Sequence, residues 1–137
     1  MKRRPTKAIA LAMTVSAAAV LAPLQASAQY KGPTIKIGIL NDQSSLYADT
    51  SGMGGVNAAR LAVEDFGAEK KGMKVEIVFA DHQNKPDIGS GIARRWWETE
   101  NVDLITDVGT SSVGLAVNEV ARTLGKAYIN TGSATSD

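Results

Sequence analysis

Three consecutive hydroxyl residues, Thr110, Ser111 and Ser112, stand where the sequence pattern changes from a predicted strand to a predicted helix. The first backbone N–H groups of a helix have no acceptor within the helix, and the helix dipole is positive there. Such N–H groups, helped by short hydroxyls, can hold a small carboxylate. A Ser in this place can also act as an ordinary helix cap. The same composition recurs after the next predicted strand, around Gly132 and Ser133, which favours binding.

Neither a dinucleotide site nor a hydrolase site fits the spacing of the polar residues. The pair Gly52 and Gly54 is separated from the first predicted strand by eleven residues, whereas a dinucleotide-binding turn follows its strand at once. Ser111 lies in GTSSVG, where Val113 occupies the place of the second glycine of a nucleophile elbow. His82 lies in a polar loop and is expected to fix that loop by hydrogen bonds. We therefore expect a protein that is not an enzyme and uses no cofactor and no metal.

The charge balance argues against a nucleic-acid partner. Lys2, Arg3, Arg4 and Lys7 are the only charged residues among the first 28, which leaves 11 basic and 14 acidic residues in the rest of the 137-residue chain. A mildly acidic body lacks the basic surface with which proteins displace counterions from nucleic acid. The chain has no Cys and one His, so disulfide scaffolds, thiol chemistry and multi-histidine metal sites within one chain are excluded.

Residues 1–28 have the three regions of a secretory signal peptide. A basic start is followed by an apolar run over residues 8–22, and Ala26 and Ala28 supply the small side chains that signal peptidase requires. The alternative, a membrane anchor, is disfavoured because the run is shorter than the roughly 20 apolar residues of a membrane-spanning helix. We therefore expect cleavage after Ala28 and a mature, exported chain that begins at Gln29.

Beyond the signal, apolar β-branched segments alternate with segments of helical periodicity. Strands are predicted at residues 34–40, 74–80, 102–108 and 126–130, and helices at 56–67, 86–100 and 113–124. Pro86 opens the second helix, and Gly67 and Gly125 end the first and third. Strands joined by helical crossovers run parallel, so the fold class is α/β, a doubly wound parallel sheet with helices on both faces. In such a sheet, ligands bind at the carboxyl ends of the strands.

The body, residues 29–137, is long enough for one small core. Of the adjacent Trp96 and Trp97 in the second predicted helix, one is expected to pack on the sheet and the other to lie nearer the surface. The sequence ends seven residues after the fourth predicted strand with no covering helix, although a parallel strand is normally buried on both faces. We therefore expect the chain to be the start of a longer protein.

Five segments, preceded by the export signal, occur in an order that resembles one protein family: KIGILNDQSSLYAD, GGVNAARLAVEDFG, VEIVFADHQNKPD, VDLITDVGTSS and AYINTGSATSD. They look like the type I periplasmic solute-binding proteins that serve branched-chain amino acid ABC transporters. The similarity covers residues 34–137. The resemblance implies two α/β lobes that close on a ligand, of which this chain carries the N-terminal part of the first lobe and lacks the second.

The ligand contacts of that family, carried over residue by residue, lie in three loops. They fall on Ser44, Ser45 and Tyr47 after the first strand, on Thr110 and Ser111 after the third, and on Gly132 and Ser133 after the fourth. The resemblance further implies a periplasmic, non-catalytic component of an ABC importer with a membrane permease as its partner. Its small-molecule ligand would be a branched-chain amino acid or a related small organic or aromatic acid. Ala134 stands where amino-acid binders often have Thr, which is a departure from that pattern.

Two function classes remain open from the sequence. The first is a solute-binding protein that delivers its ligand to a permease, and the second is the ligand-sensing domain of a receptor or regulator with the same fold. A second lobe followed by a stop would favour transport, and a downstream transmembrane helix or kinase region would favour sensing. An exported enzyme is a distant third, which any turnover lost in Ser111→Ala would revive.

Overall fold

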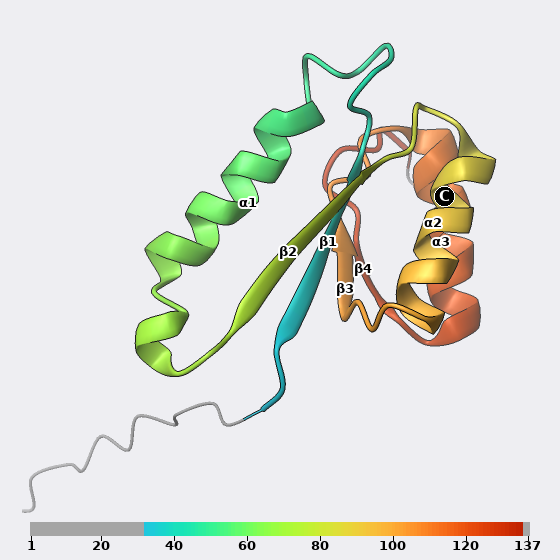
Figure 1. Cartoon of the computed structure of the whole chain (residues 1–137). Helices are drawn as coiled ribbons and strands as arrows, with labels where there is room; N and C mark the ends of the chain where they lie inside the picture. The colour runs from blue at the N-terminus through green and yellow to red at the C-terminus, as the bar shows by residue number, and fades with distance from the viewer. Residues whose placement is uncertain (1–31, 136–137) are drawn as a thin grey trace, which may run out of the picture.

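The computed structural model describes residues 32–135, in which strands and helices alternate along the chain (Figure 1). The elements are β1 (Ile35–Asn41), α1 (Gly52–Phe66), the 3₁₀ helix η1 (Glu69–Lys71), β2 (Val75–Asp81), α2 (Pro86–Glu98), β3 (Leu104–Thr106), α3 (Ser111–Leu124) and β4 (Ala127–Ile129). The predicted order of strands and helices is confirmed. The predicted signal peptide, with Ala26 and Ala28, lies outside the described residues. None of the helices in residues 32–135 combines the length and hydropathy that a membrane crossing requires.

Several boundaries differ from the prediction, and each difference has a local cause. α1 begins at Gly52, four residues early, because the N–H of Gly55 already donates to the carbonyl of Ser51 at 2.9 Å. β3 covers three residues instead of seven, and its carboxyl end lies at Thr106 because Asp107 has φ of 64° and leaves the extended conformation. α3 begins at Ser111, so the hydroxyl residues predicted to form a loop belong to its first turn.

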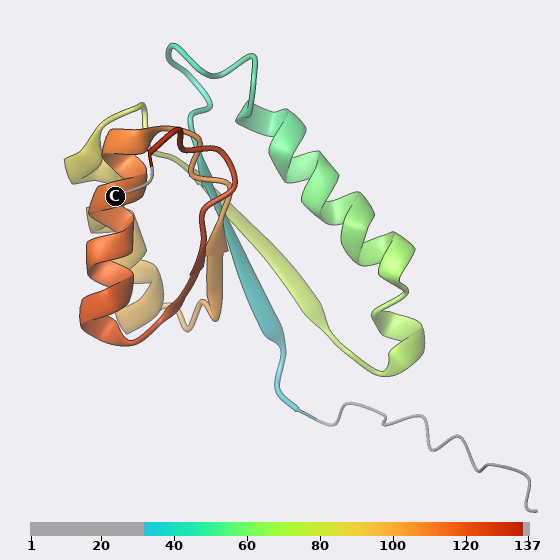
Figure 2. The same ribbon diagram turned by 180° about the vertical axis from the view of Figure 1, so that it is seen from behind.

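The four strands form one parallel sheet in the order β2-β1-β3-β4. Ile39 of the central strand β1 lies opposite Phe79 of β2 and Thr106 of β3. α1 covers one face of the sheet, and α2 and α3 lie side by side on the other (Figures 1 and 2). The predicted fold class, a doubly wound parallel sheet with helices on both faces, is confirmed. Gly67 and Gly125 end their helices in the left-handed conformation, as predicted.

The main core lies between the sheet and the pair α2–α3. Its buried members are Leu40, Ala93, Trp96, Trp97, Val102, Ile105, Val108, Val113, Val117, Val120 and Ala121. A Cβ at Gly38 of β1 would lie 2.5 Å from the ring of Trp96, so glycine lets this ring approach the sheet closely. Trp96 and Trp97 are each 3% exposed, and the expectation that one lies near the surface is wrong. α3 packs beside α2, and both helices contribute buried residues, including Trp97, to this core.

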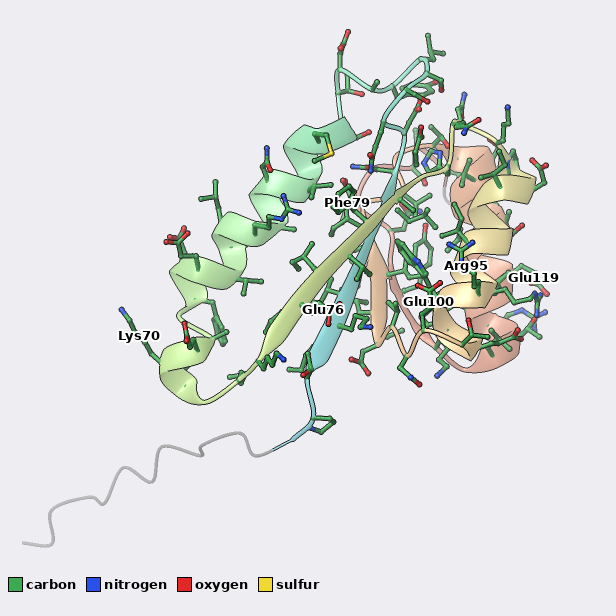
Figure 3. The ribbon with its side chains drawn as sticks, in the orientation of Figure 1. Lys70, Glu76, Phe79, Arg95, Glu100 and Glu119 are labelled. Atoms are coloured by element: carbon green, nitrogen blue, oxygen red, sulfur yellow. The ribbon has the colours of Figure 1, made fainter. Side chains whose placement is uncertain are left out.

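The face of the sheet under α1 is covered less completely. Phe79, labelled in Figure 3, and Ile129 are 42% and 52% exposed on this side. The guanidinium carbon of Arg60 lies 5.3 Å from the centre of the Phe79 ring, a cation–π contact that shields one side of the ring. α1 is anchored mainly through the buried Gly52 and Val56 near its start. The tightest packing around this helix is therefore at the carboxyl end of β1.

Candidate functional site

The buried polar side chains of residues 32–135 gather at one end of the sheet. Asn41, Asp42, His82 and Thr110 are at most 6% exposed, and each ends a strand or lies in the loop that follows one. Burying such groups costs free energy unless they are hydrogen-bonded. Their clustering at one end of the sheet therefore indicates a hydrogen-bonded polar network there. The carboxyl ends of the strands, at the top of Figure 1, are also where open parallel sheets bind ligands.

A second concave region lies elsewhere, at the amino end of β2. It has a volume of about 940 Å³ and is lined by the second half of α1, by η1 and by the start of β2. Its charged residues, among them Arg60, Glu64 and Lys70, are exposed, and Figure 3 shows Lys70 pointing away from the sheet. None of its described lining residues is both polar and buried. The strand ends are therefore the better candidate site, because they hold fixed polar groups.

Asp42 organises the loop after β1. Its Oδ1 accepts the N–H of Ser45 at 2.9 Å, and its Oδ2 accepts the N–H of Tyr47 at 2.9 Å and the hydroxyl of Ser45 at 2.5 Å. Burial acts to raise the pKa of Asp42, but the hydrogen bonds from Ser45, Tyr47 and Ser44 outweigh it and hold the pKa below the ordinary 3.8. The carboxylate is therefore charged at neutral pH and accepts the hydrogen bonds that hold the loop.

Asp81, the last residue of β2, holds the same loop from the neighbouring strand. Its Oδ1 accepts the N–H groups of Gln43 at 2.9 Å and Gln83 at 2.8 Å, and its Oδ2 accepts the hydroxyl of Ser44 at 2.5 Å. Burial acts to raise the pKa of Asp81, but these hydrogen bonds lower it overall. Two of the predicted ligand residues, Ser44 and Ser45, thus donate their hydroxyl protons to carboxylates of the protein itself.

Asn41 joins the end of β1 to α1 and to β3. Its Nδ2 donates to the carbonyl of Gly52 at 2.7 Å and to Oδ2 of Asp107 at 2.9 Å. A Cβ at Gly55 would overlap that same Asp107 oxygen, so this glycine lets α1 approach the end of β3. The buried amide of Asn41 therefore ties the start of the loop after β1 to its end at Gly52 and to the half-buried Asp107.

The first turn of α3 is the other half of the site. Thr110 is the N-cap: its carbonyl accepts the N–H of Gly114 at 2.7 Å, and its side chain makes no capping hydrogen bond. The alternative in which Ser111 or Ser112 caps the helix is therefore wrong. The Thr110 hydroxyl is buried without a partner among residues 32–135. The N–H groups of residues 111–113 precede the first helical bond and have no hydrogen-bond acceptor within the part of the chain that the structure describes, so this turn offers donors at the positive end of the dipole.

Ser133 fastens the loop after β4 to this turn. Its hydroxyl oxygen lies 3.2 Å from the carbonyl oxygens of both Val108 and Thr110, to which it can donate. Gly114 of α3 leaves the space that Ser133 fills, since a Cβ there would overlap the Ser133 hydroxyl. The hydroxyl of this predicted ligand residue therefore bonds the backbone of the preceding loop.

Gly132 and Ser111 complete the same junction. A Cβ at Gly132 would lie 3.0 Å from Cα of Gly109, so two glycines allow the loops after β3 and β4 to touch. The hydroxyl of Ser111 accepts the N–H of Ala134 at 3.1 Å, which leaves its own proton available to a ligand. The structure thus brings Thr110, Ser111 and the predicted loop residues Gly132 and Ser133 together.

His82 has the structural role expected from the sequence. Its Nδ1 accepts the N–H of Asn84 at 2.9 Å and so fixes the loop after β2. Burial lowers the pKa of His82 below the ordinary 6.5, against the opposing effect of the carboxylates of Asp42 and Asp81. No group of three or more His, Cys, Asp or Glu within residues 32–135 could hold a metal ion.

The organising roles of Asn41, Asp42 and Asp81 were missed by reasoning from the sequence. Asp42 had a usable signal: an Asp directly after a strand and shortly before two Ser residues is typical of a side chain that caps its own loop. The bond from Ser44 to Asp81 spans 37 positions and had no local signal.

Comparison with known proteins gives one family. A family model described as "Periplasmic binding protein" matches residues 34–137. No curated protein matches the sequence. Among solved structures, a periplasmic binding protein from Burkholderia mallei is 44% identical with a TM-score of 0.71; the alignment covers 75% of this chain and 28% of that one.

Two further structures agree with this match. A branched-chain amino acid ABC transporter periplasmic ligand-binding protein from Burkholderia xenovorans LB400 is 40% identical, with a TM-score of 0.70 and coverage of 74% and 27%. The branched-chain amino acid transporter substrate-binding protein LivJ from Streptococcus pneumoniae, solved with isoleucine, has a TM-score of 0.68, coverage of 76% and 30%, and 23% identity, which supports the fold alone. The chain thus spans less than a third of the length of these structures.

Proposed function

The chain belongs to the periplasmic binding protein family, and on that premise we propose that it is part of the extracytoplasmic solute-binding component of an ABC importer. Its ligand would be a branched-chain amino acid or a related small organic or aromatic acid, bound without chemical change. The 40% identity to a protein named for branched-chain amino acid transport supports this class of ligand.

The observation that carries the proposal is the unpartnered buried hydroxyl of Thr110 at the start of α3. A buried hydroxyl without a partner costs free energy, and a ligand oxygen beside it would remove that cost. The free N–H groups of residues 111–113 and the uncommitted proton of Ser111 point to a carboxylate as that partner. Tyr47, 39% exposed, is the proposed contact from the loop after β1.

The remaining parts of the proposal follow from the family. Residues 29–137 would form the N-terminal part of one lobe, and a second lobe would complete the pocket and close over the ligand. Residues 1–28 would direct export to the periplasm, with cleavage after Ala28, and a membrane permease would receive the ligand. Closure of two lobes buries a ligand far more completely than one rim of loops, so the affinity of this chain alone should be modest.

A titration of the chain with leucine, isoleucine and benzoate, followed by the amide resonances in NMR spectra, tests the proposal. Saturable shifts are expected at residues 111–113 and at Tyr47. The resonances of the concave region lined by α1, η1 and the start of β2 should not shift. Leucinamide, which lacks the carboxylate, is the matched control and should leave residues 111–113 unshifted. Absence of a saturable shift with all three acids would contradict binding by this half of the site.

A further inference from the structure

Tyr47 combines a fixed backbone with an exposed ring. Its N–H donates to Asp42, and its carbonyl accepts the N–H groups of Thr50 and Ser51, each at 3.1 Å. The hydroxyls of Thr50 and Ser51 lie 3.0 and 3.2 Å from the same carbonyl. The residue is nevertheless 39% exposed. The backbone of Tyr47 is thus fixed by several hydrogen bonds while its side chain stays accessible to a ligand.

The charged groups that hold this loop come from two different strands. Asp42 follows β1, and Asp81 ends the neighbouring strand β2. Between them they accept hydrogen bonds from the backbone N–H groups of residues 43, 44, 45 and 47. A loop held from two strands cannot shift as a unit without breaking charge-assisted bonds, which are stronger than bonds between neutral groups.

The hydroxyls of Ser44 and Ser45 belong to this arrangement. Each lies 2.5 Å from a carboxylate oxygen, the distance of a charge-assisted O–H···O⁻ bond. A hydroxyl has one proton, and a ligand carboxylate would have to compete for it with a fixed carboxylate of the protein. Neither Ser is therefore placed to donate to an acidic ligand.

We propose that Asp42 and Asp81 are positioning residues that fix the loop after β1, with Ser44 and Ser45 as their partners, and that Tyr47 alone of the three predicted residues in this loop contacts the ligand. This inference rests on the proposed function for its binding consequence, whereas the fixing of the loop is measurable without ligand. Preorganisation of this kind raises affinity because the loop pays less ordering entropy when the ligand arrives.

The test uses Asp42→Asn in the whole chain, with Asp49→Asn as the matched control. An amide side chain keeps one acceptor oxygen, but places an NH₂ group against the donors that Oδ2 now accepts. Asp49 lies in the same loop and is exposed, so its substitution makes the same change of charge away from the carboxylate network. Ser45→Ala, which removes one hydroxyl donor and leaves the carboxylate, serves as a milder second variant.

Hydrogen–deuterium exchange without ligand decides the positioning role. In Asp42→Asn, exchange over residues 43–50 should rise about tenfold while α2 and α3 keep their protection, and Asp49→Asn should match the unsubstituted chain. Ser45→Ala should show a smaller rise in the same segment. Unchanged exchange over residues 43–50 in Asp42→Asn, or an equal rise throughout the fold, overturns the inference.

The pH profile gives a readout that a general loss of stability would not reproduce. The pKa values of both carboxyls lie below 3.8, so they hold the loop fully above that pH and release it as pH falls through their lowered values. The neighbouring charges are these: Asp42 acts to raise the pKa of Asp81, and both carboxylates, together with Asp107, act on His82. Burial lowers the pKa of His82 below 6.5, so its protonation lowers the stability of the fold as pH falls below 6.5. The protection of amides 43–50, measured relative to their intrinsic exchange rates at each pH, should therefore fall below pH 3.8 in the unsubstituted chain. In Asp42→Asn this loss of protection should be smaller.

Titration with leucine and benzoate then distinguishes ligand contact by Tyr47 from positioning of the loop by Asp42. Asp42→Asn should weaken whichever acid binds by about tenfold, and Tyr47→Phe should weaken it without changing exchange in the loop. Ser44→Ala should weaken binding less than Tyr47→Phe, and the reverse order would overturn the assignment of Tyr47. If the unsubstituted chain binds neither acid, the proposed function fails, and the exchange data alone support or overturn the positioning role of Asp42.

Discussion

The loop after β1 and the junction between α3 and the loop after β4 border the same end of the sheet but are built from different chemistry. The first is held by two carboxylates, the buried Asp42 and the half-buried Asp81, which accept hydrogen bonds from its backbone and its serines. The second is held by neutral hydroxyls, such as that of Ser133, and by the close approach of Gly109 and Gly132. In the first region the hydroxyl donors of the serines bond to carboxylates of the protein, whereas in the second the Thr110 hydroxyl has no partner within the described residues 32–135.

This difference indicates which half receives the negative charge of a ligand. A ligand carboxylate brought to the loop after β1 would be repelled by the two fixed negative charges of Asp42 and Asp81. The N–H and hydroxyl donors of this loop already bond to those two carboxylates. The same carboxylate at α3 would meet the positive end of a helix dipole, with N–H groups and a Thr110 hydroxyl that have no partner among the residues the structure describes. The charged half therefore serves to shape the site, and the neutral half serves to bind.

The largest effect on this comparison is expected from Gly55→Ala in the charged half. A Cβ at Gly55 would overlap the Asp107 oxygen that accepts the bond from Asn41, and the displaced carboxylate is short and partly buried. We expect a loss of about 2–4 kcal/mol in the free energy of unfolding, measured by urea denaturation. Gly54→Ala is the matched control, because nothing lies within 4 Å of a Cβ there and alanine favours the helix. Equal stability of the two variants would show that the contact between α1 and the end of β3 is loose.

The corresponding change in the neutral half, Gly114→Ala, should cost less. Its Cβ would overlap the hydroxyl of Ser133, but Ser133 lies in a mostly exposed loop that can move aside. We expect a loss of about 1–2 kcal/mol, partly offset by the helix propensity of alanine. Gly91→Ala in α2, where a Cβ has open space, should instead stabilise by up to about 1 kcal/mol. A larger loss for Gly114→Ala than for Gly55→Ala would reverse the comparison.

The sequence was sufficient for the fold, because the fold follows from local patterns. Alternation of strands and helices fixed a parallel sheet, and the glycines at 67 and 125 ended helices as their lack of a side chain predicts. The burial of Trp97 could not be predicted in the same way. It depends on α3 lying beside α2, which is a tertiary contact with no signal in the helix itself.

The hydrogen-bond partners of the individual candidate residues could not be predicted, for the same reason. Ser44 and Ser45 have the residue type and position of ligand contacts, and nothing in the sequence states that Asp81 lies beside one of them. A hydroxyl is a ligand donor only if its proton is free, and that depends on partners from other strands. Thr110 and Ser133 differ in this way although both are hydroxyl residues at strand ends: the first has no partner among residues 32–135 and the second bonds two carbonyls.

The smallest effect on stability, and the most informative about binding, is expected from Thr110→Val. Valine keeps the shape of threonine and removes a buried hydroxyl that makes no bond, so the free energy of unfolding should stay within about 1 kcal/mol or rise slightly. Thr106→Val is the matched control, since that hydroxyl donates to the carbonyl of Ile129 at 3.1 Å and its loss should cost about 1 kcal/mol.

Affinity should respond in the opposite order. Thr110→Val should weaken a bound acid by about tenfold, measured by calorimetric or NMR titration, because it removes a donor that only the ligand uses. Thr106→Val should leave affinity nearly unchanged. If Thr110→Val destabilises the fold as Thr106→Val does and binds as tightly as the unsubstituted chain, the hydroxyl has an internal partner. The neutral half would then resemble the charged half in consuming its donors.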